Sequence, residues 1–333
     1  MKFLKIFIIN LFLGMGLNLT AAVNVFSEEI RAYPNKMIKI VIPYVQGSQP
    51  DVVANLFVSG IKRHFPLVKL VTENVPGASG GLGAEKVYQA LPDGYTLLLG
   101  RVASQVVVPI MNKKSTYHWD DFVMLGLLEV EPQICFVSYK SPFKNIEEFL
   151  SAVRSSPGKL KFGHTGEETI LNLIVRYLLN LEGLKQSSLQ GIDLSRSSKT
   201  IPEHLLAGDI DFACTNSGSI VNEINGGKLR ALFSTSSGRI PQLPHLKNAR
   251  EVGFPDLFEI IGWAALVGPK KMPKHVVKFW KEALIELSKD PVWREDLIKI
   301  GVVQALGSVK DNENFIRQQN DRYKRIATIM EMQ

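Results

Sequence analysis

The chain has 333 residues, of which 45% are hydrophobic, and a formal net charge of +7. This length and composition allow about two domains with large cores, and they exclude a disordered chain or a collagen-like repeat. The basic residues are scattered rather than clustered, and no nucleic-acid-binding motif interleaves them with aromatic residues, so we expect no nucleic-acid partner.

The first residues have the layout of a secretory signal peptide. Lys2 and Lys5 form a basic start, residues 6–19 are apolar apart from two asparagines, and the small residues 20–22 precede a polar stretch. We therefore predict that residues 1–22 are cleaved off and that the mature protein is periplasmic. The alternative is an uncleaved anchor, although the apolar run is short for a span of about 20 residues.

The mature chain begins with a strand, a polar loop and a helix. Residues 38–42 are almost continuously apolar, as in a buried strand, and apolar residues recur at helical spacing from Val53 onward. Asp51 can cap this helix, so the loop and the helix N-terminus form a candidate site for an anion. The loop supplies five candidate ligand-binding residues: Tyr44, Gly47, Ser48, Gln49 and Asp51.

A glycine-rich loop joins the second strand and helix. It follows an alternating apolar run at residues 67–71, precedes an amphipathic run at residues 84–91, and contains Pro-Gly-Ala-Ser-Gly-Gly at residues 76–81. Glycine lets backbone N–H groups approach a ligand, and the following helix adds its positive end, so the loop suits a carboxylate or a phosphate. An ordinary tight turn is the alternative, because nucleotide-binding spacings are absent. The candidate ligand-binding residues are Ala78, Ser79, Gly80 and Gly81.

The third strand, at residues 96–99, leads into a segment that contains Arg101 and Ser104. Arg101 could clamp a carboxylate with two hydrogen bonds, or it could face solvent or pair with an acidic residue. We include both Arg101 and Ser104 among the candidate ligand-binding residues. Because strands alternate with helices, we predict a parallel sheet with the ligand beyond the carboxyl ends of its strands.

A second unit of strands and helices follows residues 119–128. Apolar runs predict strands at residues 133–137, 160–163 and 210–214. The loops after two of these strands supply further candidate ligand-binding residues: Thr165, Gly166, Thr169 and Asn216.

Two acidic residues, Glu167 and Glu168, interrupt the first of these loops. Beside a cleft they would repel a di- or tricarboxylate unless they point outward, which favours a less anionic or even an amine-bearing solute. The alternative is that they are simply acidic residues near a helix N-terminus, where negative charge is favourable.

Strands at residues 229–233 and 260–267 return the chain to the first unit, and helices then begin at Pro273, Pro291 and Asn312. Trp263 either packs in the core or lines the cleft, and we include it among the candidate ligand-binding residues.

The chain contains only two cysteines, Cys135 and Cys214, and both lie in apolar strands. This placement predicts buried free thiols, with a disulfide as the alternative in an oxidising compartment. The six histidines are dispersed, and no nucleophile motif occurs. We therefore expect no catalytic residue, metal or cofactor. An enzyme whose groups assemble from distant parts of the chain is the alternative.

The order of several motifs resembles the solute receptors of tripartite tricarboxylate transporters, the Bug family. Residues 73–80 and 90–98 are similar to the family signature E-N-x-P-G-A-x-G followed by A-x-P-D-G-Y-T-L-L. The resemblance covers nearly the whole mature chain. Further landmarks occur in the family's order at residues 43–47, 119–122, 157–160, 207–211, 227–232 and 243–244.

This resemblance implies an α/β periplasmic binding protein of the type II-like, Venus-flytrap kind, with two lobes that each contain a mainly parallel sheet flanked by helices. We expect residues 33–127 with 235–333 to form lobe one and residues 128–234 to form lobe two. The implied function is a monomeric receptor that closes on a small solute, a carboxylate by resemblance, and delivers it to a membrane permease. A ligand-sensing partner of a membrane signalling protein is the alternative. The sequence departs from the family pattern at Ser48, Arg101, Glu167, Glu168 and Thr215, so the solute itself is not implied.

Overall fold

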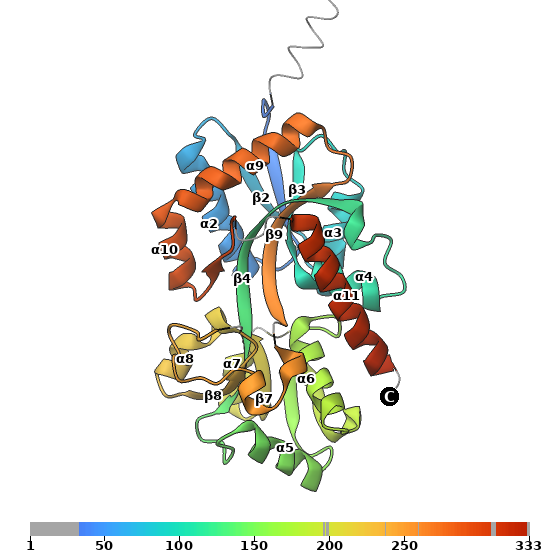
Figure 1. Cartoon of the computed structure of the whole chain (residues 1–333), viewed down its shortest axis with the longest axis vertical. Coiled ribbons are helices and arrows are strands. Elements are labelled where there is room, and N and C mark those ends of the chain that lie inside the picture. Colours follow the sequence, from blue (N-terminus) through green and yellow to red (C-terminus); the bar gives the residue numbers. More distant parts are fainter. Residues whose placement is uncertain are drawn as a thin grey trace, which may run out of the picture.

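The computed structural model describes residues 33–331 apart from positions 196, 198, 199, 237, 259 and 308–310, so the predicted signal peptide lies outside the described residues. Two lobes stack along the long axis of the molecule and are joined by long strands (Figure 1). Among the described residues, no helix combines the length and the apolar character needed to cross a membrane.

The sheet of the first lobe has a parallel and an antiparallel part. β1 (Ile38–Ile42) pairs in parallel with β2 (Leu70–Asn74) and β3 (Thr96–Arg101). Beyond β3, β9 (Ile261–Pro269) and β4 (Phe122–Ser138) continue the sheet in antiparallel pairs. The short strand β10, residues 303–304, pairs with β4.

Helices cover both faces of this sheet. On one face, Phe57 and Trp280 pack with ring centroids 6.2 Å apart and join two of the covering helices. The helices of this face are α2 (Gln49–His64), α9 (Lys274–Lys289) and α10 (Pro291–Lys299). The helices of the other face are α3 (Gly81–Tyr88), α4 (Val108–Met111) and α11 (Asn312–Glu331).

The sheet of the second lobe repeats this plan. β5 (Lys161–His164) pairs in parallel with β6 (Gln190–Asp193) and β7 (Phe212–Asn216), while the last part of β4 pairs antiparallel with β7 and β8 (Leu229–Ser234). Its helices are α5 (Ile146–Ser155) and α6 (Ile170–Leu181) on one face, and α7 (Ile201–Ala207) and α8 (Val221–Asn225) on the other.

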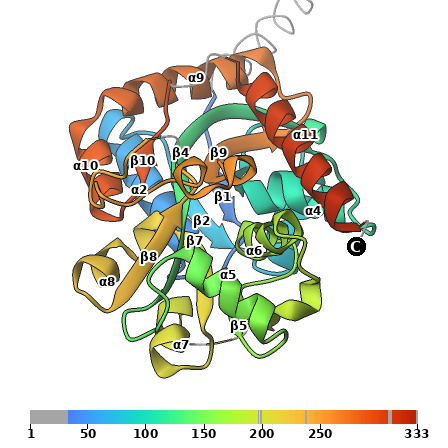
Figure 2. The same ribbon diagram turned by 60° about the horizontal axis from the view of Figure 1, so that its bottom comes forward.

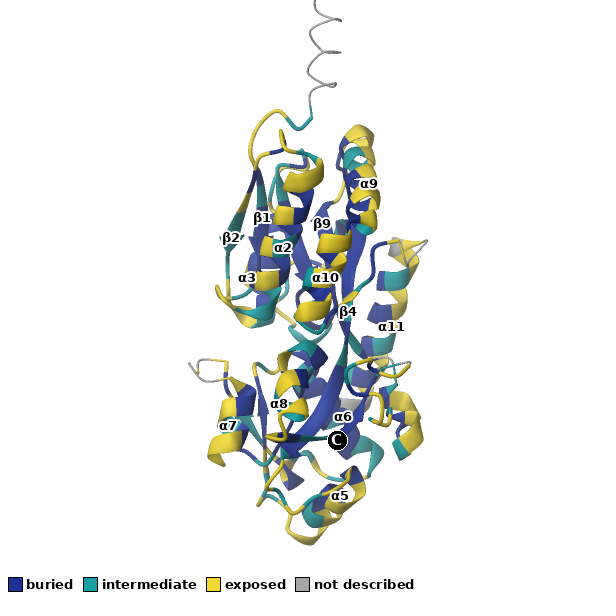
Figure 3. Ribbon diagram, turned by 90° about the vertical axis from the view of Figure 1, so that its left-hand side faces the viewer, coloured by how far each residue is buried: buried dark blue, intermediate teal, exposed yellow. Residues whose placement is uncertain are grey.

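Buried residues run along both sheets and through the connection between them, while the exposed residues lie on the outer helix faces (Figure 3). α11 contacts α4 in the first lobe and α6 in the second, and it runs down beside both lobes (Figures 1 and 2). One apolar core therefore continues from lobe to lobe beneath α11. The predicted two-lobed α/β architecture is confirmed. Every antiparallel pair named above contains β4 or β9, the strands that connect the lobes.

The strand pairing passes between lobes later in the chain than residues 127 and 234, where we expected the crossings. β4 pairs with β9 up to Pro132 and with β7 and β8 from Gln133 onward. On the return, Phe254 still packs on Phe233 of β8, with ring centroids 6.2 Å apart, and β9 begins only at Ile261. The described residues between 235 and 260 form no named strand, so no apolar periodicity revealed that they pack with the second lobe.

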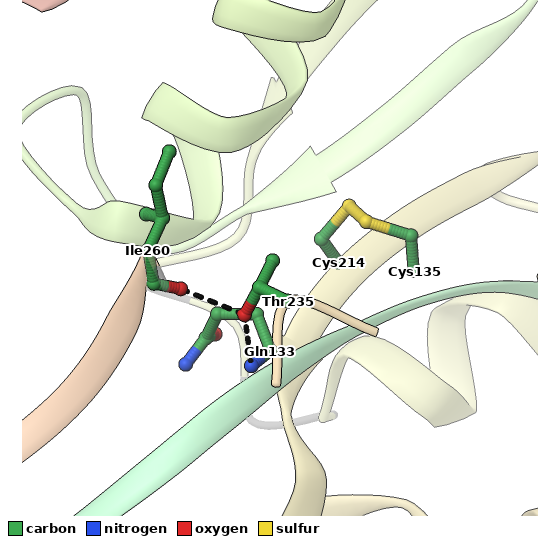
Figure 4. The surroundings of a disulfide bond; sticks show 5 residues. All are labelled: Gln133, Cys135, Cys214, Thr235 and Ile260. Carbon is green, nitrogen blue, oxygen red and sulfur yellow. Dashed lines mark hydrogen bonds between the residues drawn. A yellow bond between two sulfur atoms is a disulfide. The ribbon is translucent and has the colours of Figure 1, made fainter. Parts of the chain in front are cut away.

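Thr235 joins the two crossing segments (Figure 4). Its N–H donates to the carbonyl of Gln133 at 2.9 Å, and its hydroxyl accepts a hydrogen bond of 2.9 Å from the N–H of Gln133. The same hydroxyl donates to the carbonyl of Ile260 at 2.7 Å. Because Thr235 is fully buried, this side chain satisfies backbone groups of both segments where water cannot reach them.

Cys135 and Cys214 form a disulfide, so the prediction of free thiols is wrong. The antiparallel register of β4 and β7 places the two residues directly opposite each other, with their Cα atoms 3.9 Å apart. The apolar pattern predicted both strands but not their pairing, because register across 79 residues of sequence leaves no local signal. The bond lies just inside the second lobe, next to the crossing at Gln133 (Figure 4).

This disulfide predicts how the protein reacts with a thiol reagent. Protein denatured without a reductant should take up no alkylating reagent, and after reduction it should take up two equivalents, as measured by intact mass. The Cys135→Ala, Cys214→Ala double variant should lose about 2–5 kcal/mol of unfolding free energy in denaturant titrations. Alkylation of the unreduced protein would show that the thiols are free.

The hydrogen bonds of Thr235 predict a measurable contribution to stability. Thr235→Val keeps the shape of the side chain but leaves the N–H of Gln133 and the carbonyl of Ile260 without this hydroxyl, so we expect a loss of about 1–3 kcal/mol. Thr235→Ser keeps the hydroxyl and is the matched control, with a smaller loss. Equal losses in the two variants, measured by urea unfolding, would argue against the hydrogen bonds and for lost packing.

Candidate functional site

A cavity of about 850 Å³ lies between the two lobes. A loop follows each strand of the two parallel sets, β1, β2, β3 and β5, β6, β7, and all of these loops contribute to the wall. Parallel strands end at one edge of their sheet, so the two edges face each other across the cavity. The volume lies in the range of small-molecule sites.

Most of the predicted ligand-binding residues meet at this cavity. The loop after β6 also lines it, and we did not predict that loop because Gln190-Gly-Ile-Asp193 has no apolar run from which to predict a strand. The predicted residues on the wall are Tyr44, Ser48, Gln49, Ala78, Ser79, Gly80, Arg101, Thr165, Gly166, Thr169 and Asn216.

Four predicted residues do not line the cavity: Gly47, Asp51, Gly81 and Ser104. Asp51 accepts hydrogen bonds from the N–H of Gly47 at 3.0 Å and from Nδ2 of Asn74 at 2.8 Å, so it braces the first loop against β2. The hydroxyl of Ser104 accepts from the N–H of Arg101 at 3.0 Å. These residues shape the loops that face the cavity.

Trp263 does not line this cavity, and of its two alternatives the structure shows packing in the core. Its side chain is fully buried and packs edge-on against Phe315 of α11, with ring centroids 5.9 Å apart. On β9 the neighbouring residue, Gly262, reaches the cavity instead. Because side chains alternate along a strand, the large ring points into the core.

The glycine-rich loop has an unusual backbone. Gly77 and Gly80 have positive φ angles, and so do the two non-glycine residues between them, Ala78 at 49° and Ser79 at 52°. A side chain in this region costs about 1–2 kcal/mol, and such strain often accompanies a binding role. α3 begins directly after the loop, so its positive end lies beside Ser79.

Two hydrogen bonds between side chains cross the cleft. Oγ of Ser79 in the first lobe donates to Oε2 of Glu168 in the second lobe at 2.8 Å. Nδ2 of Asn216 in the second lobe donates to Oε1 of Gln49 in the first lobe at 2.9 Å. A Cβ atom added at Gly166 would lie 2.8 Å from Oγ of Ser79, so glycine allows the two loops to meet. The lobes are therefore in contact around the cavity.

Arg101 pairs with acidic residues, one of the alternatives for its role. The residue is 5% exposed, and its guanidinium binds Glu129 through Nη1 and Glu131 through Nη2, the latter at 2.8 Å. Glu131 also accepts a hydrogen bond from Nε2 of Gln49. We call Arg101, Glu129 and Glu131 the charge cluster. Both carboxylates are fully buried, so Arg101 directs both of its terminal nitrogens to acidic partners inside the protein.

The sequence contained a signal for the charge cluster that was missed. Glu129 and Glu131 are two residues apart in β4, within a largely apolar strand, so they fall on the same face. Buried carboxylates of this kind require a positive partner. The sequence placed Arg101 at the end of another strand, but only the pairing through β9 brings the two strands together.

Burial raises the pKa of Glu129 to about 8, although the charge of Arg101 opposes this effect, and the nearby charge of Glu131 raises it further. Burial also raises the pKa of Glu131. At neutral pH Glu129 therefore holds a proton for most of the time.

This raised pKa predicts a pH-dependent stability. Between the ordinary pKa of 4.5 and the raised pKa of about 8, the folded state holds a proton that the unfolded state has lost, so stability falls as the pH rises. Glu129→Gln keeps an oxygen near Arg101, now that of an amide, which has no titratable proton. The unfolding free energy of this variant should fall less than that of the native protein over this pH range. If the unfolding free energies of the two proteins, measured by urea titration, changed equally with pH, the raised pKa would not belong to Glu129.

Comparisons with known proteins agree with this geometry. Residues 62–332 match the family described as the tripartite tricarboxylate transporter family receptor. A "UPF0065 protein in tcbD-tcbE intergenic region" of Pseudomonas sp. strain P51 is 26% identical over 314 residues, which cover 94% of this chain and 91% of that protein.

Solved structures show the same fold. One described as a periplasmic transporter has a TM-score of 0.80 at 26% identity, over 89% of this chain and 98% of its own. MatC from Rhodopseudomonas palustris, with bound malate, has a TM-score of 0.77 at 24% identity, over 88% and 99%. The predicted family resemblance is thereby confirmed. The chain belongs to the tripartite tricarboxylate transporter receptor family, and it is a two-lobed periplasmic solute-binding protein.

Proposed function

We propose that this receptor captures a small carboxylate between its lobes and delivers it to the membrane permease of a tripartite transporter. The observation that carries the proposal is the cavity walled by the loops at the carboxyl ends of both parallel strand sets. Membership of the receptor family supports the transport role, and the malate bound to MatC supports a carboxylate as the solute class.

The first lobe would hold the carboxylate of the solute. The strained glycine-rich loop places the hydroxyl of Ser79 on the cavity wall, and the positive end of α3 follows directly. Backbone N–H groups can bind a carboxylate without a positive side chain, as helix N-termini do. This mode of binding suits a site in which Arg101 is already paired.

The second lobe would close over the solute from the opposite side. Thr169 stands at the N-cap position of α6, and its hydroxyl donates to the carbonyl of Gly166 at 2.7 Å, which shapes the loop that contains Thr165 and Gly166. Asn216 is held in place because its Oδ1 accepts from Nε2 of Gln133 at 2.7 Å while its Nδ2 donates to Gln49. When the lobes close, Asn216 would therefore connect Gln49 of the first lobe with Gln133 of β4.

We propose that the lobes move about the segments joined by Thr235, with residues 133–260 as one unit and the rest of the described chain as the other. Opening would break the hydrogen bonds from Ser79 to Glu168 and from Asn216 to Gln49. A solute that contacts both lobes binds the closed form better and so shifts the population toward it. The closed rim is the surface that the permease would recognise.

We propose further that the protein acts as a monomer, without catalysis, after residues 1–22 have directed it to the periplasm.

The proposal is tested by a thermal-shift screen of the mature protein, residues 23–333, against mono-, di- and tricarboxylates, amino acids and neutral solutes. A ligand at about a hundred times its dissociation constant should stabilise the protein by about 2.7 kcal/mol, which raises the melting temperature. We expect stabilisation by solutes that carry a carboxylate. A response only to neutral solutes would overturn the proposed solute class.

A single substitution in the same assay tests the location of the site. Ser79→Trp places a large ring on the cavity wall, so it should abolish stabilisation by the carboxylate found in the screen while the protein stays folded. Ser151→Trp is the control, because Ser151 is exposed on α5 and does not line the cavity. Undiminished binding by a folded Ser79→Trp variant would remove the glycine-rich loop from the site.

A further inference from the structure

Glu168 reaches from the second lobe to the glycine-rich loop of the first. Its Oε2 accepts the hydrogen bond from Oγ of Ser79 at 2.8 Å, and its half-buried side chain lines the cavity. The neighbouring residue differs, because the side chain of Glu167 is 64% exposed and bonds to Asn172 within its own lobe. Of the two acidic residues, Glu168 is thus the one placed against the proposed carboxylate site.

Among the described residues, no ion pair neutralises Glu168. Arg101 is the one described basic residue on the cavity wall, and its guanidinium is bound by Glu129 and Glu131. The other charged residues described on the wall, Glu167 and Asp193, are acidic, and Asp193 accepts a hydrogen bond of 2.8 Å from the N–H of Ser195. Among the described wall residues, Glu168 is thus the carboxylate that meets the glycine-rich loop without a basic partner.

This arrangement constrains a solute whose carboxylate sits on the glycine-rich loop. That carboxylate would lie beside Glu168, and two neighbouring carboxylates repel each other unless a proton or a positive group lies between them. An ammonium group next to the solute carboxylate would provide the positive group. Its N–H bonds would go to Glu168, while the carboxylate would accept hydrogen bonds from the loop.

We infer that Glu168 is a specificity-determining residue, which selects solutes that carry an ammonium group beside their carboxylate, as α-amino acids do, over plain carboxylates. The inference rests on the proposed function, since it assigns the solute class of the same cavity. It also gives a role to the hydrogen bond from Ser79, which holds Glu168 at the place where the ammonium group arrives.

Matched pairs of solutes test the inference by isothermal titration calorimetry. The pairs are succinate with aspartate, glutarate with glutamate, and propionate with alanine, which differ only in the amino group. For at least one pair, the native protein should bind the amino member more tightly by about tenfold or more, the value of one charged hydrogen bond. In Glu168→Gln the amino member should lose about tenfold or more, while the plain member keeps or gains affinity.

Two further variants complete the design. Glu167→Gln removes the neighbouring charge, which does not reach the first lobe, and should reduce the preference for the amino member by a smaller factor than Glu168→Gln does. Glu168→Asp keeps the charge but withdraws it from Ser79, so the preference should fall by a smaller factor than in Glu168→Gln. Melting temperatures of all variants check that they are folded.

The outcomes separate this inference from the proposed function. If the native protein binds plain carboxylates as tightly as their amino partners, or if Glu168→Gln changes both members of a pair equally, the inference is wrong while the receptor still binds carboxylates. An equal gain for both members would mean that Glu168 only occupies the site in place of a solute. If no carboxylate of either kind binds, the proposed function and the inference both fail.

Discussion

The arrangement of the site depends on the charge cluster formed by Arg101, Glu129 and Glu131. β4 carries both glutamates and belongs to both sheets, so the cluster lies where the lobes join. Removing one partner from a buried ion pair leaves an unpaired charge, which typically costs about 3–5 kcal/mol. The ion pairs of Arg101 therefore serve the stability of the protein. Through Gln49, which bonds both Glu131 and Asn216, the cluster also connects to the side chains that meet across the cleft.

The pairing of Arg101 affects which groups on the cavity wall can bind a carboxylate. With the guanidinium of Arg101 already occupied, the described groups left for a carboxylate are backbone N–H groups, hydroxyls and the positive end of α3. The strained backbone of Ala78 and Ser79 fits a binding role, because both residues lie on the cavity wall. Glu168 then adds a negative charge at the same place. The wall can thus hold a carboxylate while it discriminates according to what lies beside that carboxylate.

Local patterns in the sequence predicted the elements and many of the loops, but not the relations between distant strands. The apolar run at residues 38–42 and the helical spacing after Val53 correspond to β1 and α2, and the loops after the parallel strands meet at the cavity as expected. The disulfide, the partners of Arg101 and the later crossings all depend on register in β4, which no local pattern encodes. For Trp263, the alternation of side chains along β9 decided between core and cleft, and the strand's orientation was not known beforehand.

The most direct test is a crystal structure of the mature protein with the tightest-binding carboxylate found in solution. We predict a solute enclosed between the lobes, with its carboxylate against the glycine-rich loop at Ser79 and with Arg101 still bound to Glu129 and Glu131. A solute bound outside this cavity would show that the cleft is not the binding site. A carboxylate held by Arg101 after that residue had left its two glutamates would also contradict this prediction, because the charge cluster would then be part of the binding site rather than the structure that supports it.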